Sequence, residues 1–120
     1  NFAPHSGSSI LHPHIQLSAG SFATNRARRM LQASYRAWFR GKDLVAQWIH
    51  AERAAGERWC ARVGAWHLVM AFAPRGRFFE LNLIHESALP FVSLSRGDIS
   101  DLARGVTHVF RFISSMGLTS

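Results

Sequence analysis

The segment from residue 58 to residue 74, RWCARVGAWHLVMAFAP, decides the fold, because hydrophobic side chains in its second half recur at every second position. A period of two is typical of a β-strand whose alternate side chains face opposite sides of a sheet. We therefore predict a strand over 66–73. One face of it carries Trp66, Leu68, Met70 and Phe72, and the other carries His67, Val69 and Ala71.

Two further strands are predicted beside this one. Gly64 indicates a turn between a strand over 58–63 and the strand over 66–73. A second turn, at 74–76, leads to a strand over 78–85 with Phe79, Leu81 and Leu83 on one side. Consecutive strands with short connections pair with their neighbours, so the three predict an antiparallel meander.

Helical periodicity flanks the meander on both sides. A helix over 24–39 would begin at Thr24 or Asn25, and a helix over 44–55 would lie between an Asp43 cap and Gly56. A third helix would begin at a capping box made by Ser95 and Asp98 and end at Gly117. The predicted fold class is α+β, an antiparallel sheet with packed helices. The predicted apolar stripes are Met30, Leu31, Tyr35, Trp38 and Phe39 in the first helix, Leu44, Val45, Trp48 and Ile49 in the second, and Ile99, Leu102, Ala103, Val106, Val109, Phe110 and Ile113 in the third.

Composition narrows the function classes. The 120 residues are 48% hydrophobic, which is typical of a globular protein, and no apolar run approaches the ~20 residues that cross a bilayer. Cys60 is the single cysteine and cannot form an internal disulfide, so we expect a cytoplasmic protein without a membrane partner. The net charge is +7, but basic residues do not alternate with exposed aromatic ones, so a nucleic-acid partner is disfavoured. The clustered positive charges, Arg26, Arg28, Arg29, Arg36, Arg40 and Lys42, are interpreted as a solvated helix face.

The segment SGSSILHPHIQL, residues 6–17, carries the strongest chemical signal. On a strand over 12–17, His12, His14 and Gln16 would share one face. Pro13 cannot donate to a sheet ladder, so this strand is expected at an edge. The preceding Gly/Ser turn offers backbone N–H groups to a phosphate.

Three chemistries fit this segment. A His-x-His pair supplies two metal ligands, although His5 is the only other histidine nearby in sequence. A neutral imidazole can instead attack a phosphoryl group and carry it as a phosphoramidate, with Gln16 steadying the oxygens. The third interpretation is a polar strand edge without chemistry. The Gly/Ser turn and Gln16 on the same face favour phosphoryl transfer.

The segment resembles the active-site segment of the galactose-1-phosphate uridylyltransferase family, a branch of the histidine-triad superfamily. That segment has Asn, five residues, Gly-x-Ser, two residues and His-Pro-His-x-Gln, and residues 1–16 match each position. The resemblance continues by pattern to the C-terminus, with Phe78-Phe79-Glu80 where the family has Pro-Phe-Glu. It implies a histidine-triad-like, partial two-repeat architecture in which 1–40 end a first repeat and 41–120 start a second. We also expect the chain to be part of a longer protein.

The resemblance implies a UDP-glucose:hexose-1-phosphate uridylyltransferase activity, with a nucleotide sugar and a sugar 1-phosphate as partners. His14 would be the nucleophile, and Gln16 would bind the transferred phosphoryl group. Asn1, Gly7 and Ser9 would contact the nucleotide. His12 matches a zinc ligand whose partners would lie outside this chain, and a homodimer is a further expectation. The alternatives are a non-catalytic nucleotide-binding or dimerisation module, or a related adenylyl-transferring or phosphorylase-type enzyme.

The remaining titratable residues do not form a catalytic pattern in the sequence. Glu52, Glu80 and Glu86 lack the spacing of an acid/base pair, and a solvent-facing position is favoured for Glu80 over a bond to an arginine. Cys60 is interpreted as a small strand residue. The scattered histidines are interpreted as surface or hydrogen-bonded core residues: His50, His67, His85 and His108.

Overall fold

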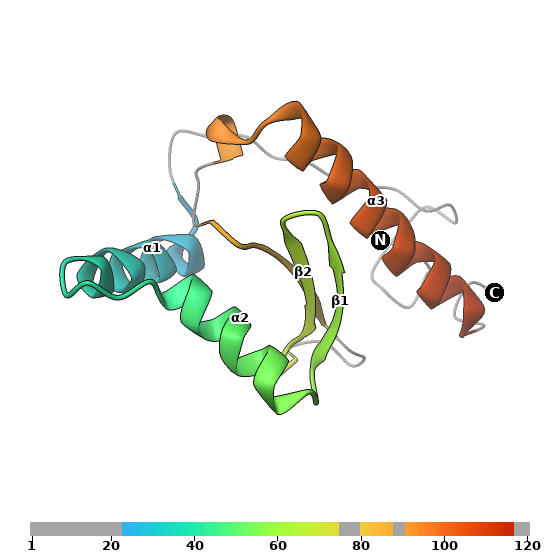
Figure 1. Cartoon of the computed structure of the whole chain (residues 1–120), viewed down its shortest axis with the longest axis horizontal. Coiled ribbons are helices and arrows are strands. Elements are labelled where there is room, and N and C mark those ends of the chain that lie inside the picture. Colours follow the sequence, from blue (N-terminus) through green and yellow to red (C-terminus); the bar gives the residue numbers. More distant parts are fainter. Residues whose placement is uncertain (1–22, 75–79, 88–90, 117–120) are drawn as a thin grey trace.

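The computed structural model describes residues 23–74, 80–87 and 91–116, and its fold is α+β, as predicted. Within these residues, two α-helices precede a three-stranded antiparallel sheet, and a third α-helix follows it (Figure 1). The elements are α1 (Asn25–Trp38), α2 (Leu44–Ala55), β1 (Trp59–Val63), β2 (Trp66–Met70), β3 (Leu81–His85), the short 3-10 helix η2 (Phe91–Ser93) and α3 (Arg96–Ser115).

The sheet is the predicted meander, with the strand order β1-β2-β3. A tight turn at Gly64 joins β1 to β2, so that Val63 lies opposite Trp66 and Arg62 lies opposite His67. β2 is the central strand and contains Val69, which has no exposed surface. The sheet lies between α2 on one face and α3 on the other, while α1 packs beside α2 (Figure 1).

α3 is fixed to the sheet at its N-terminal end. The indole of Trp66 donates a hydrogen bond of 2.8 Å to the backbone oxygen of Asp98. The predicted capping box is present, because Ser95 and Asp98 each accept from the other's backbone N–H. Two turns farther along, Gly105 lies against the Leu83 side chain, where a Cβ would be only 3.0 Å from a methyl carbon. The absence of a side chain at this position therefore sets how closely α3 approaches β3.

A buried carboxylate joins α2 to β1. Glu52 accepts hydrogen bonds of 3.0 to 3.3 Å from the Arg58 guanidinium and one of 3.0 Å from the Trp48 indole. The arginine lowers the pKa of this carboxyl, because the ionised form is the one that accepts these bonds. Gly56 ends α2 in the left-handed conformation, with φ of 68°. The predicted Asp43 cap and Gly56 stop of this helix are both confirmed.

α1 forms where predicted, with Thr24 as its N-cap, but its apolar stripe is not buried by the described residues. The five stripe side chains are between 51% and 69% exposed, and Ala37 is the buried residue of the helix. Tyr35 and Phe39 instead pack edge to face on each other, with ring centres 4.7 Å apart. The arginines of this helix are exposed, in agreement with a solvated basic face.

Two further predictions are corrected. The central strand ends at Met70, short of the predicted residue 73. β3 comprises Leu81–His85, and its predicted start at Phe78 lies outside the described residues. The α3 stripe, expected in the core, is mostly half-buried, and Ile99 is 46% exposed. α3 has 20 residues and is about 30 Å long, whereas each strand has five residues and spans about 17 Å. The sheet is therefore too short to cover the whole stripe. The strand predicted over 12–17 lies outside the described residues.

The turn at Gly64 provides a test of how the hairpin meets α3. Gly64 has a φ of 57°, and a Cβ there would overlap the Asp101 carboxylate, whereas a Cβ at Gly56 would meet nothing within 4 Å. Both alanine variants carry the left-handed backbone cost of about 1–2 kcal/mol. We expect Gly64→Ala to lower the free energy of unfolding by up to about 1 kcal/mol more than Gly56→Ala, because the Asp101 carboxylate must swing aside and lose its pairing with Arg104. Equal losses in urea unfolding would contradict the close approach.

Candidate functional site

The residues predicted to carry the chemistry lie outside the part of the chain that the structure describes. The site that the structure does describe is built from other residues. The predicted set is Asn1, Gly7, Ser9, His12, His14 and Gln16.

A polar pocket lies between α2 and the face of the sheet that α2 covers. Its cavity volume is about 560 Å³. The α2 wall contributes His50 and Arg53 with apolar Ile49, and the sheet contributes Arg62 from β1 and His67 from β2. Glu86, directly after β3, completes the wall and is the one carboxylate among the described lining residues.

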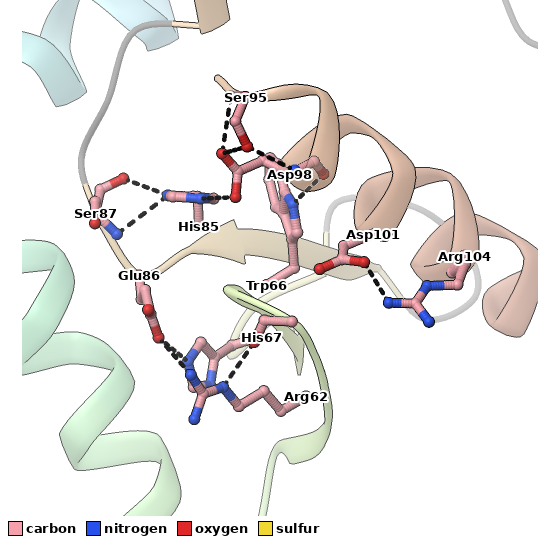
Figure 2. A network of polar contacts seen from close by, with 11 residues as sticks. Arg62, Trp66, His67, His85, Glu86, Ser87, Ser95, Asp98, Asp101 and Arg104 are labelled. Carbon is pink, nitrogen blue, oxygen red and sulfur yellow. Dashed lines mark hydrogen bonds and ion pairs between the residues drawn. The ribbon is translucent and has the colours of Figure 1, made fainter. Parts of the chain in front are cut away.

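Glu86 links the two sheet residues of the pocket (Figure 2). Its Oε2 accepts a hydrogen bond of 2.9 Å from the Arg62 guanidinium and lies 3.8 Å from His67 Nε2. Arg62 is also held by a bond of 2.8 Å from its Nε to the backbone oxygen of Gly64. The Arg62 side chain is thus fixed at both ends of its guanidinium by groups from the hairpin and from β3.

His67 is 2% exposed, and its tautomer follows from its partner on β1. The Trp59 indole N–H lies 3.2 Å from His67 Nδ1. An indole can only donate, so Nδ1 accepts and the proton of the neutral ring is on Nε2. Nε2 is the atom that faces Glu86. A buried histidine therefore presents an N–H donor to the pocket.

Burial lowers the pKa of His67, and the positive charges of Arg62 and Arg53 act in the same direction. Glu86 opposes them and raises it. The net direction is downward, so the ring is neutral near pH 7. The Nε2–H donor is accordingly the resident form of this side chain.

Arg53 supplies the charge that the pocket does not neutralise. Its guanidinium carbon lies 5.7 Å from the Trp59 ring centre, and it forms no ion pair among the described residues. Arg62 and Glu86 compensate each other. With His67 neutral, one positive charge remains in excess, and the side chain that carries it is exposed.

A second polar cluster, on the opposite face of the sheet, is structural. His85 Nε2 lies 3.4 Å from Asp98 Oδ1, and its Nδ1 is 2.8 Å from the backbone oxygen of Ser87. Hydrogen bonds from Ser95 lower the pKa of Asp98, with a smaller contribution from His85 in the same direction. Figure 2 shows this cluster at the start of α3, where it joins β3 to the capping box. Its groups face one another, and the buried Nε2 of His85 makes no hydrogen bond to the described residues beyond this 3.4 Å approach to Asp98.

The described residues contain no group of three or more His, Cys, Asp or Glu side chains that could hold a metal ion. Zinc was expected through His12, which is outside them. The described part of the chain also has no helix that is both long and apolar enough to span a bilayer.

The sequence predicted the surroundings of individual residues better than it predicted the pocket. His67 is a buried, hydrogen-bonded residue, as predicted, and Cys60 is an exposed strand residue. Glu80 was expected to face solvent, but it is partly buried and lies 3.4 Å from Arg26. The sequence feature that could have indicated the pocket is the turn at Gly64. In a hairpin with this turn, Arg62 and His67 lie opposite each other on the two strands.

Comparisons with known proteins give one informative relative. An uncharacterized protein of Archaeoglobus fulgidus is 29% identical over 122 aligned residues, which cover 100% of this chain and 36% of that protein. The chain thus spans about a third of the length of this relative. No protein-family model matches the chain, and no solved structure matches it.

The lowered pKa of His67 predicts a pH dependence of stability. An unfolded chain protonates this ring near 6.5, whereas the folded chain resists protonation until a lower pH. The corresponding stability is present above pH 6.5 and is lost as the pH falls through the lowered pKa. We therefore expect the free energy of unfolding to decrease between pH 7.5 and 5.5, and to decrease less in His67→Gln. In a urea-unfolding series, exposed His108→Gln is the control and should keep the wild-type slope; an unchanged slope in His67→Gln would contradict the assignment.

Proposed function

We propose that this chain carries the nucleotidyl-transfer segment of an enzyme that resembles UDP-glucose:hexose-1-phosphate uridylyltransferases. The observation that carries the proposal is the match of residues 1–16 to the Asn, Gly-x-Ser and His-Pro-His-x-Gln positions of that family. The α+β fold, with helices on both faces of an antiparallel sheet, is compatible with a histidine-triad-like architecture. In this proposal, residues 1–40 end one repeat and residues 41–120 begin the next.

The proposed reaction is a double displacement. An imidazole nitrogen of His14 attacks the α-phosphorus of the nucleoside diphosphate sugar, and the bond from that phosphorus to the bridging oxygen breaks. Sugar 1-phosphate leaves with that oxygen, and the nucleotidyl group stays on the histidine. A phosphate oxygen of a second sugar 1-phosphate then attacks the same phosphorus and releases the imidazole. Both steps use one phosphate subsite.

The other motif residues have supporting roles in this scheme. Gln16 would donate hydrogen bonds to the phosphoryl oxygens as charge develops on them. Gly7 and Ser9 would offer backbone and hydroxyl donors to the nucleotide phosphates, with Asn1 beside the nucleotide. His12 would supply one ligand to a structural zinc, whose other ligands would come from outside this chain.

A second candidate function follows from the small part of the relative's length that the chain covers. A chain that aligns with about a third of a longer protein could contribute nucleotide binding or dimer contacts while the rest of the machinery lies elsewhere. This non-catalytic module binds nucleotide without forming a covalent adduct. An adenylyl-transferring or phosphorylase-type relative would form the adduct with a different base.

The test is the intact mass of the chain after mixing with UDP-glucose, with a non-acidic quench because phosphoramidate bonds are labile to acid. We expect a uridylyl adduct in the wild-type chain and its loss in His14→Gly, because the variant lacks the nucleophile. His5→Gly is the matched control and should still be labelled. An adduct that persists in His14→Gly would refute the assignment. Nucleotide binding without an adduct would favour the non-catalytic module, and an adduct only from ADP-glucose would favour the adenylyl branch.

A further inference from the structure

We propose that the pocket between α2 and the sheet is a binding site for the phosphate group of a small phosphate monoester, held by Arg53, Arg62 and His67. This site is built from described residues alone and uses none of the 1–16 motif. It therefore goes beyond the proposed nucleotidyl transfer and does not depend on it.

The first step of the argument is charge. Two guanidinium groups and one carboxylate line the pocket, and the carboxylate is paired with Arg62 at 2.9 Å. Arg53 has no such partner among the described residues. The pocket consequently favours an anion. Arginine is also the side chain best suited to a phosphate, because its planar fork can offer two parallel N–H donors.

The second step is the preset donor of His67. The Trp59 indole occupies Nδ1 and leaves the Nε2 proton directed to the pocket wall that Glu86 and Arg62 form. Its Nε2 lies 3.8 Å from the Glu86 carboxylate, which is longer than a good hydrogen bond, so Glu86 holds this donor only weakly. A phosphate oxygen in the pocket would give this proton a closer partner.

The third step is the composition of the remaining wall. Ile49, Ala46 and Ala54 line the α2 side of the cavity, whose volume is about 560 Å³. Such a cavity lies in the range of small-molecule sites, which combine apolar walls with a few placed polar groups. A lone phosphate ion would leave the apolar wall uncovered. An organic phosphate could place its phosphate on the arginines and its organic part on Ile49.

The position of Arg53 fits this role. It lies over the Trp59 ring, which is the same ring that fixes His67. The stacking restrains the guanidinium without neutralising it. One tryptophan thus positions both the charged donor and the neutral donor of the site.

The experiment is isothermal titration calorimetry of the chain at low ionic strength with phenyl phosphate, inorganic phosphate and benzoate. We expect saturable binding of phenyl phosphate, weaker binding of inorganic phosphate because it leaves the apolar wall uncovered, and weaker binding of benzoate because a carboxylate offers fewer acceptor oxygens. Arg53→Gln should lower the affinity for phenyl phosphate about tenfold or more, which is the loss expected for one charge-assisted hydrogen bond. Arg53→Lys should recover part of that loss.

Arg104→Gln is the matched control, because it removes the same charge from an exposed arginine that is paired with Asp101 on α3. It should bind phenyl phosphate as the wild type does. An equal loss in both variants would mean general attraction to a chain of net charge +7 and would overturn the proposal. Absence of saturable binding would overturn it as well, and equal binding of benzoate would remove the phosphate assignment.

A second variant tests the carboxylate. Glu86→Gln removes the only described negative charge in the pocket while an amide oxygen can still accept from Arg62. Phenyl phosphate should therefore bind more tightly to this variant; weaker binding would show that the ligand donates to Glu86 and is not a simple anion. His14→Gly should bind phenyl phosphate normally, so failure of the covalent-labelling test and failure of this test are distinguishable.

Discussion

The central strand β2 is packed on both faces, and the rest of the described structure follows from that constraint. Val69 has no exposed surface, and its neighbours Trp66 and His67 are buried on opposite sides. Each face needs a cover, which α2 and α3 provide. Each buried polar atom also needs a partner, because an unpaired one costs about 1–3 kcal/mol. The bonds from Trp66 to α3 and from Trp59 to His67 are such partners.

The two faces satisfy their polar groups differently, and this difference separates structure from a candidate function. On the α3 face, Ser95 donates to the Asp98 carboxylate and His85 lies 3.4 Å from it, so the anion of that cluster has its partners within the cluster. On the α2 face, Arg62 and Glu86 compensate each other, but Arg53 has no ion pair with a described residue and the Nε2–H of His67 faces the pocket. A closed network rigidifies the fold, whereas an open one of excess positive charge can accept an anionic ligand.

Local signals allowed most of the fold to be predicted from the sequence. Asp43 and Gly56 mark the two ends of α2, Ser95 and Asp98 mark the start of α3, and the Gly64 turn sets the register of the hairpin. Each of these signals depends only on residues that are close to it in the sequence. What failed depends on distant surfaces. The α1 stripe is exposed, since a helical period says that a face is apolar but not what covers it.

The same distinction applies to the candidate site. The resemblance of residues 1–16 rests on a contiguous motif, which a sequence displays directly. The pocket instead joins residues from α2, from two strands and Glu86. The sequence indicated only one part of it, the cross-strand pair of Arg62 and His67. Arg53 could not be placed there by spacing, because its location depends on how α2 crosses the sheet.

Among the described residues, α3 is held most firmly to the sheet in its N-terminal half, and this has a consequence for its dynamics. Its first turn is held by the capping box and by the Trp66 indole, and Gly105 packs closely on Leu83. Toward its C-terminal end, Phe112 and Met116 are 51% and 39% exposed. Opening from a helix end needs only the local contacts to be lost. Amide hydrogen exchange along α3 should therefore form a gradient, slow near Ile99 and progressively faster toward Ser115, as the helix frays from its C-terminal end.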